Sequence, residues 1–294
     1  MTAWNQIGQF IFSGMTNGSI YALIAIGFSI IHNATGIVNF AQGEFVMLGG
    51  MMMITFYTLT GLPMPVAFLL SVFSVAVVGM LVERGPIRNS RSSSIAVLVL
   101  ITVGASIFIK GASMHIWGKS PMTLPAFSGE SPIMFLQAAI TPQSLWIMGI
   151  TIVAVSLLHL FFNYTLVGRA MRASAANSQA ARLAGINSGR MVMFSFMLSG
   201  ALGAMAGIMI TPITTTSYDV GVMLGLKGFS AAILGGYGSM PGAILGGILL
   251  GISESMSAGL ISSEYKDAIA FLILILVLIF RPAGILGQGT IKRV

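Results

Sequence analysis

Ionisable side chains are scarce within the apolar segments of this sequence, and three of them are the first candidates for chemistry. They are Glu44, Lys227 and Glu254. Ion-coupled carriers usually keep several ionisable groups at the middle of the membrane, so these three are a thin set for an ATP-independent carrier. Asp219 and Asp267 are the only aspartates, which disfavours intramembrane proteolysis by paired aspartates.

Motifs of known catalytic sites are absent from the whole chain. There is no GxxxxGK[ST] phosphate loop, no HExxH and no GxSxG. The absence of cysteine excludes disulfides, thiol catalysis and thiolate metal sites. His32, His115 and His159 lack metal-ligand spacing, so we expect no metal site. These absences disfavour a membrane enzyme and exclude ATP hydrolysis by a phosphate loop of this chain.

The elements that position the polar residues must lie in lipid. Of the 294 residues, 56% are hydrophobic and only 7% are charged, whereas roughly a quarter of the residues in a soluble domain are charged. The mean hydropathy is +0.95. The net charge of +7 comes from short basic clusters between apolar runs, as in cytoplasmic loops rather than a nucleic-acid-binding surface. We therefore expect an integral membrane protein.

Nine apolar runs predict an all-α, polytopic fold with eight or nine transmembrane helices, one of them short or broken. The first run is expected to be a retained span, because no Lys or Arg precedes it as in a secretory signal. The run 222–236 is interrupted by Gly225, Lys227 and Gly228, and is either a short span or a re-entrant half-helix. The runs are 7–31, 36–59, 63–83, 94–114, 143–163, 191–212, 222–236, 241–258 and 265–281.

Basic residues in the short loops predict the orientation of the chain. They place the loop 164–190 and the C-terminus in the cytoplasm, and the loop 115–142, with its lone acidic Glu130, outside. An even number of crossings must separate two cytoplasmic segments, so 222–236 crosses, with 237–242 inside and 259–264 outside. The side of the N-terminus stays open: five crossings put it outside, whereas a re-entrant stretch near 36–44 puts it inside. The basic residues are Arg84, Arg88, Arg91, Arg169, Arg172, Arg182, Arg190, Arg281, Lys292 and Arg293.

The segment 164–190 is the longest hydrophilic feature of the chain. It holds four arginines and no acidic residue. Its Ala-rich middle favours a helix of some 15 residues over 169–187, and Gly185 followed by Asn187 resembles a helix stop. A positive-inside anchor would explain the arginines alone. A helix that docks on a cytoplasmic partner would explain both the arginines and the helix.

Small residues recur at GxxxG spacing in the later apolar runs, a pattern that lets helix backbones approach closely in lipid. We interpret it as tight internal packing, with a hinge or conduit lining as the alternative. The spaced glycines are Gly203 and Gly207; Gly238, Gly242 and Gly246; and Gly247 and Gly251.

Four stretches together resemble the branched-chain amino acid ABC transporter permeases (Liv-type inner-membrane permease subunits). The 17–50 stretch contains the distinctive NFAQGE core. The others are GRAMRASAANSQAARLAGIN followed by SGALGAMAGIM; GLKGFSAAILGGYGSMPGAILGGILLG (225–251); and RPAGILG (281–287). They cover most of the chain in the family's order. The chain departs from the family at Gln42, where the family commonly has His.

The resemblance implies one transmembrane permease domain, residues 1–294, in the inner (plasma) membrane of a bacterial-type cell. The expected partners are a second homologous permease, two cytoplasmic ATPase subunits, an extracytoplasmic substrate-binding protein and membrane lipid, but no nucleic acid. This chain would bind no cofactor, since the partner subunits would use the ATP. The substrate would be a branched-chain or related small amino acid, with urea, short amides or aromatic acids as the alternative.

The resemblance also implies two groups of site residues, around a conduit with alternating access. For each conduit candidate, a role in bridging helices competes with substrate contact. The candidates for coupling to the ATPase are Gly168, Arg169, Arg172, Ala176, Asn177, Arg182, Gly185 and Asn187. The candidates for lining the conduit are Asn39, Gln42, Glu44 and Lys227.

Overall fold

Helices form nearly all the regular structure in the computed structural model, which describes residues 3–90, 94–129, 131–135 and 138–287. Arg91, Glu130, Lys292 and Arg293 lie outside the described residues. The helices are α1 (Ala3–Thr35), α2 (Gln42–Ile54), α3 (Met64–Val82), α4 (Ile95–Trp117), α5 (Pro142–Tyr164), α6 (Leu166–Ala176), α7 (Ser178–Leu183), α8 (Ser188–Thr214), α9 (Val220–Gly235), α10 (Met240–Leu260) and α11 (Lys266–Phe280). Short π-helical turns follow α2 (Thr55–Leu59) and α3 (Glu83–Ile87), and a 3-10 turn (Ser263–Tyr265) precedes α11.

Six of these helices are long and apolar enough to cross a membrane: α1, α3 with its π turn, α4, α5, α8 and α10. Among the described residues, α2, α9 and α11 are shorter apolar helices. The predicted all-α polytopic fold is therefore confirmed, with more short helices than expected. Large apolar side chains such as Phe73, Leu100 and Phe108 are exposed, as helices that face lipid require.

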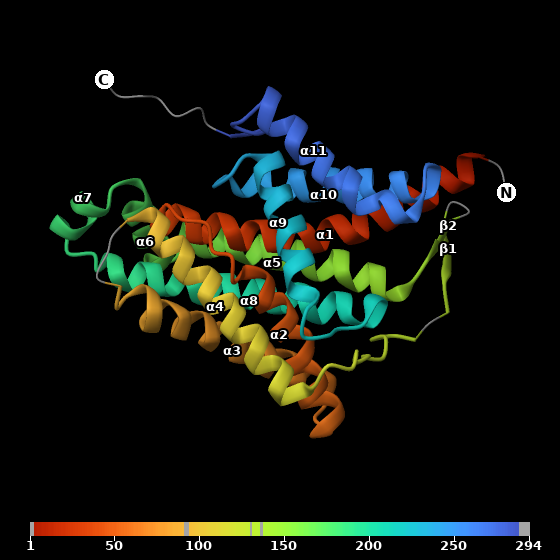
Figure 1. Ribbon diagram of the computed structural model, residues 1–294, viewed down its shortest axis with the longest axis horizontal. Coiled ribbons are helices and arrows are strands. Elements are labelled where there is room, and N and C mark those ends of the chain that lie inside the picture. Colours follow the sequence, from red (N-terminus) through yellow and green to blue (C-terminus); the bar gives the residue numbers. More distant parts are fainter. Residues whose placement is uncertain (1–2, 91–93, 130, 136–137, 288–294) are drawn as a thin grey trace.

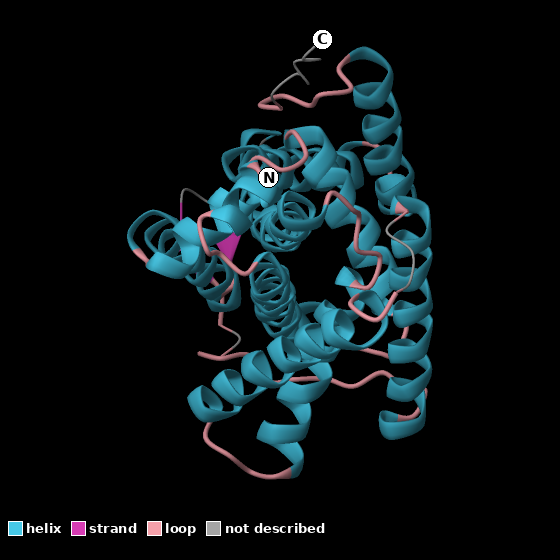
Figure 2. Ribbon diagram, turned by 90° about the vertical axis from the view of Figure 1, so that its left-hand side faces the viewer, coloured by secondary structure: helices cyan, strands magenta, loops and turns pink. Residues whose placement is uncertain are grey.

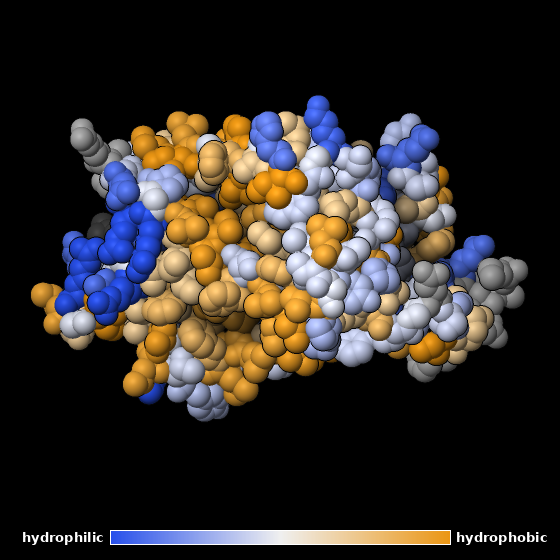
Figure 3. Space-filling view, turned by 90° about the horizontal axis from the view of Figure 1, so that it is seen from below, coloured by the Kyte–Doolittle hydropathy of each residue, from blue (hydrophilic) through white to orange (hydrophobic). Residues whose placement is uncertain are grey.

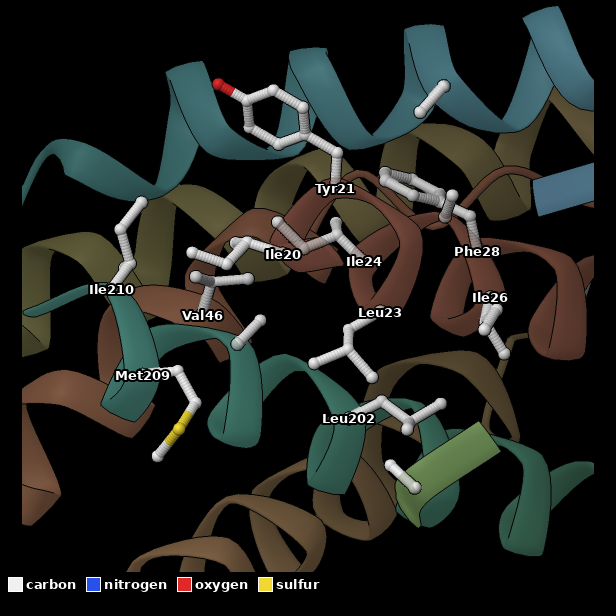
Figure 4. Close-up of a cluster of buried hydrophobic side chains, with 14 of the residues drawn as sticks. Ile20, Tyr21, Leu23, Ile24, Ile26, Phe28, Val46, Leu202, Met209 and Ile210 are labelled. Carbon is white, nitrogen blue, oxygen red and sulfur yellow. The ribbon is translucent and has the colours of Figure 1, made fainter. Parts of the chain in front are cut away.

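Helix α1 forms the centre of the bundle. Its middle residues are buried on all sides, and α8, α9 and α10 pack around it. Figure 4 shows Leu23 of α1 facing Leu202 of α8, with Val46 of α2 near Ile20. A helix buried all round needs apolar residues on every face, which explains why α1 lacks a polar stripe.

The spaced glycines sit where helix backbones touch, which supports the packing interpretation. A side chain on Gly207 of α8 would strike the carbonyl oxygen of Val46 in α2. One on Gly247 of α10 would strike the backbone of Ala22 in α1. Such approaches leave no room for a Cβ, so glycine is the residue that lets these helices meet.

The bundle has an arginine-rich end, which we define by residues 84–88, α6, α7, 184–190 and 281–286. Arg88 and Arg182 line one cavity there, and Asn33 and Arg172 line another. The Asn33 side chain also donates to the carbonyl of Gly238 (2.8 Å). Figure 3 shows hydrophilic residues gathered at the end where α6 and α7 lie in Figure 1, beside a broad apolar region.

The opposite end, which we call the hairpin end, carries a two-stranded antiparallel hairpin that the sequence did not predict. Strands β1 (Ile133–Phe135) and β2 (Ala138–Ile140) lie within the predicted external loop 115–142. Gln9 exchanges two hydrogen bonds with the backbone of Ala139. A β-bridge joins Met122 to Thr216, between α8 and α9. Gly259 packs on Phe10, so 259–264 also belongs to this end.

The loops are divided between the two ends as the predicted orientation requires. The 237–239 turn lies at the arginine-rich end, and 259–264 lies with the 115–142 loop at the hairpin end. Because α1 runs from Gln9 at the hairpin end to Asn33 at the arginine-rich end, the N-terminal end of α1 lies opposite the arginines. This arrangement matches five crossings before the loop 164–190. Which compartment each end faces stays a prediction.

Candidate conduit and coupling site

The predicted coupling helix over 169–187 is wrong as a single helix, because α6 and α7 are separated at Asn177. Asn177 has an extended backbone (φ −157°, ψ 102°), and its side-chain oxygen accepts from the N–H groups of Gln179 and Ala180. An asparagine that caps the next helix outweighs the helix propensity of the surrounding alanines. Ala176, expected near the helix midpoint, is instead the last residue of α6.

Four of the coupling candidates shape the backbone of this segment, although only Gly168 among them is buried. A Cβ on Gly168 would strike the carbonyl of Phe161, so α6 packs tightly against the end of α5. Gly185 has φ +82°, which ends α7 with a left-handed residue. Asn187 is not part of a helix stop: its side chain accepts from Arg190 N–H at the start of α8. With the cap at Asn177, these residues fix the course of the chain from α5 to α8.

The other coupling candidates are exposed at the arginine-rich end. Arg169, Ala176 and Arg182 point to the surface, while Arg172 donates to the Asn163 side chain (2.8 Å). One residue here was missed from the sequence. Leu183, the last residue of α7, is 92% exposed, and its apolar, helix-forming character gave no sign of that exposure.

The first conduit candidate, Asn39, lies in the nonhelical segment that joins α1 to α2 inside the bundle. The Asn39 side chain accepts from Ala41 N–H (3.1 Å), and Phe40 N–H donates to Thr102 in the middle of α4 (3.1 Å). Nonhelical backbone at membrane depth requires such partners. Asn39, fully buried, thus satisfies this unwound segment. Residues 36–41 are the nonhelical first part of a crossing that α2 completes.

Gln42 joins three helices at the start of α2. Its amide donates to the carbonyl of Ser199 in α8 (3.2 Å), and its oxygen accepts from the Ser199 hydroxyl. That hydroxyl also lies 2.9 Å from the carbonyl of Gly27 in α1. Gln42 is fully buried, so these contacts describe a bridge between helices rather than a surface open to substrate.

Glu44 differs from Gln42 because only one of its oxygens has a partner among the described residues; Asn39 likewise has a buried amide nitrogen, Nδ2, without one. Oε1 accepts from Ser106 in α4 (3.0 Å). Oε2 has no hydrogen-bond partner among the described residues, although the residue is only 1% exposed. The Glu44 residue lines a cavity of about 150 Å³ between α1, α2, α4 and α9, although Oε2 itself is covered by neighbouring atoms.

The first turns of α2 and α9 meet beside this cavity. Gly43 of α2 touches Gly221 and Gly225 of α9, backbone against backbone. Neither helix has a side-chain cap at its first turn. The positive ends of two helix dipoles therefore point into the same region, an arrangement of broken helices that transporters use at their binding sites.

Lys227 does not lie with the other conduit candidates. Its ammonium pairs with Glu254 of α10 (2.8 Å) and Asp267 of α11 (2.6 Å). The Tyr21 hydroxyl donates to the second oxygen of Glu254 (2.6 Å). This buried network ties α1, α9, α10 and α11 together. The sequence identified Lys227 and Glu254 as two ionisable residues, but only the structure shows that they form an ion pair.

An aromatic row leads from the Glu44 cavity toward the arginine-rich end. Phe229 packs near Phe28 and Phe40, which line the cavity with it. Beyond it, Phe229 contacts Tyr237, and Tyr237 contacts His32 edge-on (4.5 Å between ring centroids). Tyr237 lies between α9 and α10, where burial raises the pKa of its hydroxyl. The side chains of this aromatic row are therefore uncharged, except at its His32 end.

The apolar helices, the broken entry to α2 and the exposed α6–α7 segment define the class of protein, a multi-pass membrane permease. The family model for the permease component of branched-chain amino acid transport systems matches residues 10–278. The chain belongs to this family of transporters. Its members are permeases rather than catalytic enzymes.

Curated relatives cover nearly the whole chain. The high-affinity branched-chain amino acid transport system permease protein LivH of Escherichia coli K12 is 35% identical over 97% of this chain and 97% of its own length. The corresponding protein BraD of Pseudomonas aeruginosa is 34% identical over the same shares. The ribose import permease protein RbsC of Haemophilus influenzae is 27% identical over 88% of this chain and 80% of its own length.

Proposed function

We propose that this chain is one permease subunit of an ATP-driven importer for branched-chain amino acids. Membership of the permease family carries the proposal, because the full-length relatives LivH and BraD are named for branched-chain amino acid transport. A second, similar permease would complete the conduit. An extracytoplasmic binding protein would deliver the substrate. No phosphate loop is present in the sequence, so two separate ATPase subunits would supply the energy.

The coupling surface in this proposal is the α6–α7 segment at the arginine-rich end. Its exposed side chains include Arg169, Arg182 and Leu183, a basic surface with one large apolar residue at its tip. Protein interfaces combine an apolar core with a polar rim, and an exposed leucine among arginines fits that arrangement. Gly168 and Asn177 would fix the shape of this surface, so that movement of the ATPases reaches α5 and α8 through rigid contacts.

The conduit in this proposal runs along the face that α2, α4 and α9 share. Figure 2, viewed from the arginine-rich end, shows several helices of the bundle nearly end-on. Phe40, beside Glu44, is 40% exposed, so the cavity lies close to the surface of the single chain. A second permease packed on this surface would enclose the path. Asn39 and Gln42 would support its wall, and Glu44 would face it.

The test is reconstitution of the complete transporter. The chain would be tagged and expressed with the second permease, ATPase and binding-protein genes of its own genome. We expect the ATPases to co-purify, and the proteoliposomes to take up labelled leucine, isoleucine or valine only with ATP and binding protein. Purification without ATPases, or uptake that does not need ATP, would contradict the proposal. Uptake of another solute, such as ribose, would overturn the substrate assignment alone.

A further inference from the structure

The cavity at Glu44 combines one carboxylate with an apolar wall. Besides Glu44 and Ser106, its lining is apolar or glycine, with the rings of Phe40 and Phe229 on one side. Its volume of about 150 Å³ is on the order of ten times the ~15 Å³ that one water molecule needs. The space can therefore take a small organic group, not water alone.

A buried carboxylate oxygen without a donor is costly unless something else supplies one. Glu44 Oε2 has none among the described residues, and it faces the first turn of α9, where a Cβ on Gly221 would lie 2.7 Å from it. The positive helix ends favour a negative charge at this position. A donor that enters the cavity therefore meets a glutamate residue that, among the described residues, still has one oxygen without a hydrogen bond.

The surrounding charges favour a cation as that donor. The other charged groups that act on Glu44 are Lys110 and Asp219. With Glu44 these side chains carry two negative charges and one positive charge, a sum of −1, which the positive ends of α2 and α9 partly offset. The ammonium of Lys110 is already held 5.7 Å from the Tyr218 ring.

We propose that this cavity is a transient binding site for an aliphatic amino acid, with the substrate ammonium on Glu44 and the substrate side chain against Phe40 and Phe229. The substrate carboxylate faces Lys110, one helical turn from Ser106 on the same face of α4. The inference rests on the proposed function. According to this inference the permease is itself selective: after the binding protein releases its ligand, the cavity binds only a ligand that carries an ammonium group.

The test uses the purified complex of permeases and ATPases, without binding protein and nucleotide. Tritiated leucine is bound to the immobilised complex, and unlabelled leucine or 4-methyl-2-oxopentanoate competes. The oxo acid has the same aliphatic chain and carboxylate but no ammonium. We expect leucine to compete at least tenfold better. In Glu44→Gln, which keeps the shape and the Ser106 contact, leucine affinity should fall at least tenfold and the preference over the oxo acid should shrink to about twofold.

Two variants separate binding from stability. Glu83→Gln is the matched control, because Glu83 is another buried glutamate with one oxygen that has no partner in the described part of the chain, but it lies at the end of α3 away from the cavity. It should bind leucine like the parent. Phe229→Leu, which removes the aromatic face, should weaken leucine binding and leave the preference over the oxo acid in place.

The outcomes also separate this inference from the proposed function. If Glu44→Gln binds leucine and discriminates like the parent in an assembled complex that takes up leucine, the ammonium site is wrong and the importer proposal stands. If leucine does not bind the complex without binding protein, the inference is again overturned. Failure of the parent chain to assemble with ATPases would overturn the proposed function first, and this inference with it.

Discussion

Lys227 and Glu254 form an ion pair inside the bundle, with 2.8 Å between Nζ and Oε1 and both side chains at least nine-tenths buried. Asp267 of α11 also contacts the lysine, and Tyr21 donates to Glu254. A charge in this position is stable only while its partners remain. The network therefore ties α11 to the bundle, and we expect this structural role, rather than substrate contact, for Lys227.

Removing one charge of this pair should destabilise the protein. We expect Lys227→Met to lower the free energy of unfolding by about 3–5 kcal/mol, because it leaves Glu254 charged and unpaired. The double variant Lys227→Met with Glu254→Gln should recover part of the loss, since glutamine still accepts from Tyr21. Thermal unfolding in detergent, followed by gel filtration, measures both. Equal stability of Lys227→Met and the exposed control Lys266→Met would contradict the network's structural role.

The packing glycines predict a sharp contrast between two Gly→Ala changes. Gly207→Ala places a methyl group against the Val46 carbonyl, so we expect a loss of about 1–3 kcal/mol from overpacking. Gly104→Ala in α4 meets nothing within 4 Å and gains helix propensity of up to about 1 kcal/mol. Melting temperatures of the full chain should move in opposite directions. A harmless Gly207→Ala would mean that α2 and α8 do not meet there.

The two ends of the bundle predict which introduced cysteines are reached from outside. The chain has no cysteine of its own, so single replacements report cleanly. Gln6→Cys and Ser263→Cys, at the hairpin end, should react with an impermeant maleimide applied to spheroplasts. Leu183→Cys and Ser239→Cys, at the arginine-rich end, should react only after lysis. Labelling of Ser239→Cys from outside would overturn the orientation argument.

Sequence patterns predicted the features that depend on composition and spacing. Apolar runs located the membrane helices because lipid demands a long apolar stretch, and the GxxxG spacing predicted close packing that Gly207 and Gly247 realise. The patterns failed where one polar side chain changes the backbone. Asn177 divides an Ala-rich helix by capping its second half, and Asn39 satisfies an unwound segment inside an apolar run. Local hydrogen bonds of this kind outweigh average propensity.

Pairing between distant residues was also beyond the sequence. Lys227 looked like a conduit residue because nothing nearby in the chain neutralises it, whereas Glu254 reaches it from the next helix. Glu44 gave the same impression, but in the structure it lines a cavity and one of its oxygens has no partner among the residues described. Only the arrangement of α1, α2, α4 and α9 separates a structural charge from a candidate binding charge.

Leu183 should be an anchor of the ATPase contact if α7 docks on an ATPase subunit. Leu183→Asp should then lower substrate-stimulated ATP hydrolysis more than tenfold, as loss of an interface anchor worth about 2 kcal/mol would. Stability should change by no more than about 0.5 kcal/mol, because the residue is exposed in this chain. Ala176→Asp, at the end of α6, should act similarly. Leu286→Asp, an apolar-to-acid change elsewhere at the arginine-rich end, is the control and should hydrolyse ATP normally.

The arginines of α6 separate docking from simple anchoring. An anchor depends only on positive charge, whereas a docked surface depends on the planar, forked guanidinium. Arg172 donates one hydrogen bond from its guanidinium to Asn163 (2.8 Å), and Arg169 is exposed one turn before it. Arg169→Lys with Arg172→Lys should therefore leave insertion and orientation intact, measured by labelling of Ser263→Cys, while substrate-stimulated ATP hydrolysis in the reconstituted complex falls several-fold. Parental hydrolysis and uptake in this double variant would show that the arginines serve as a positive-inside anchor alone.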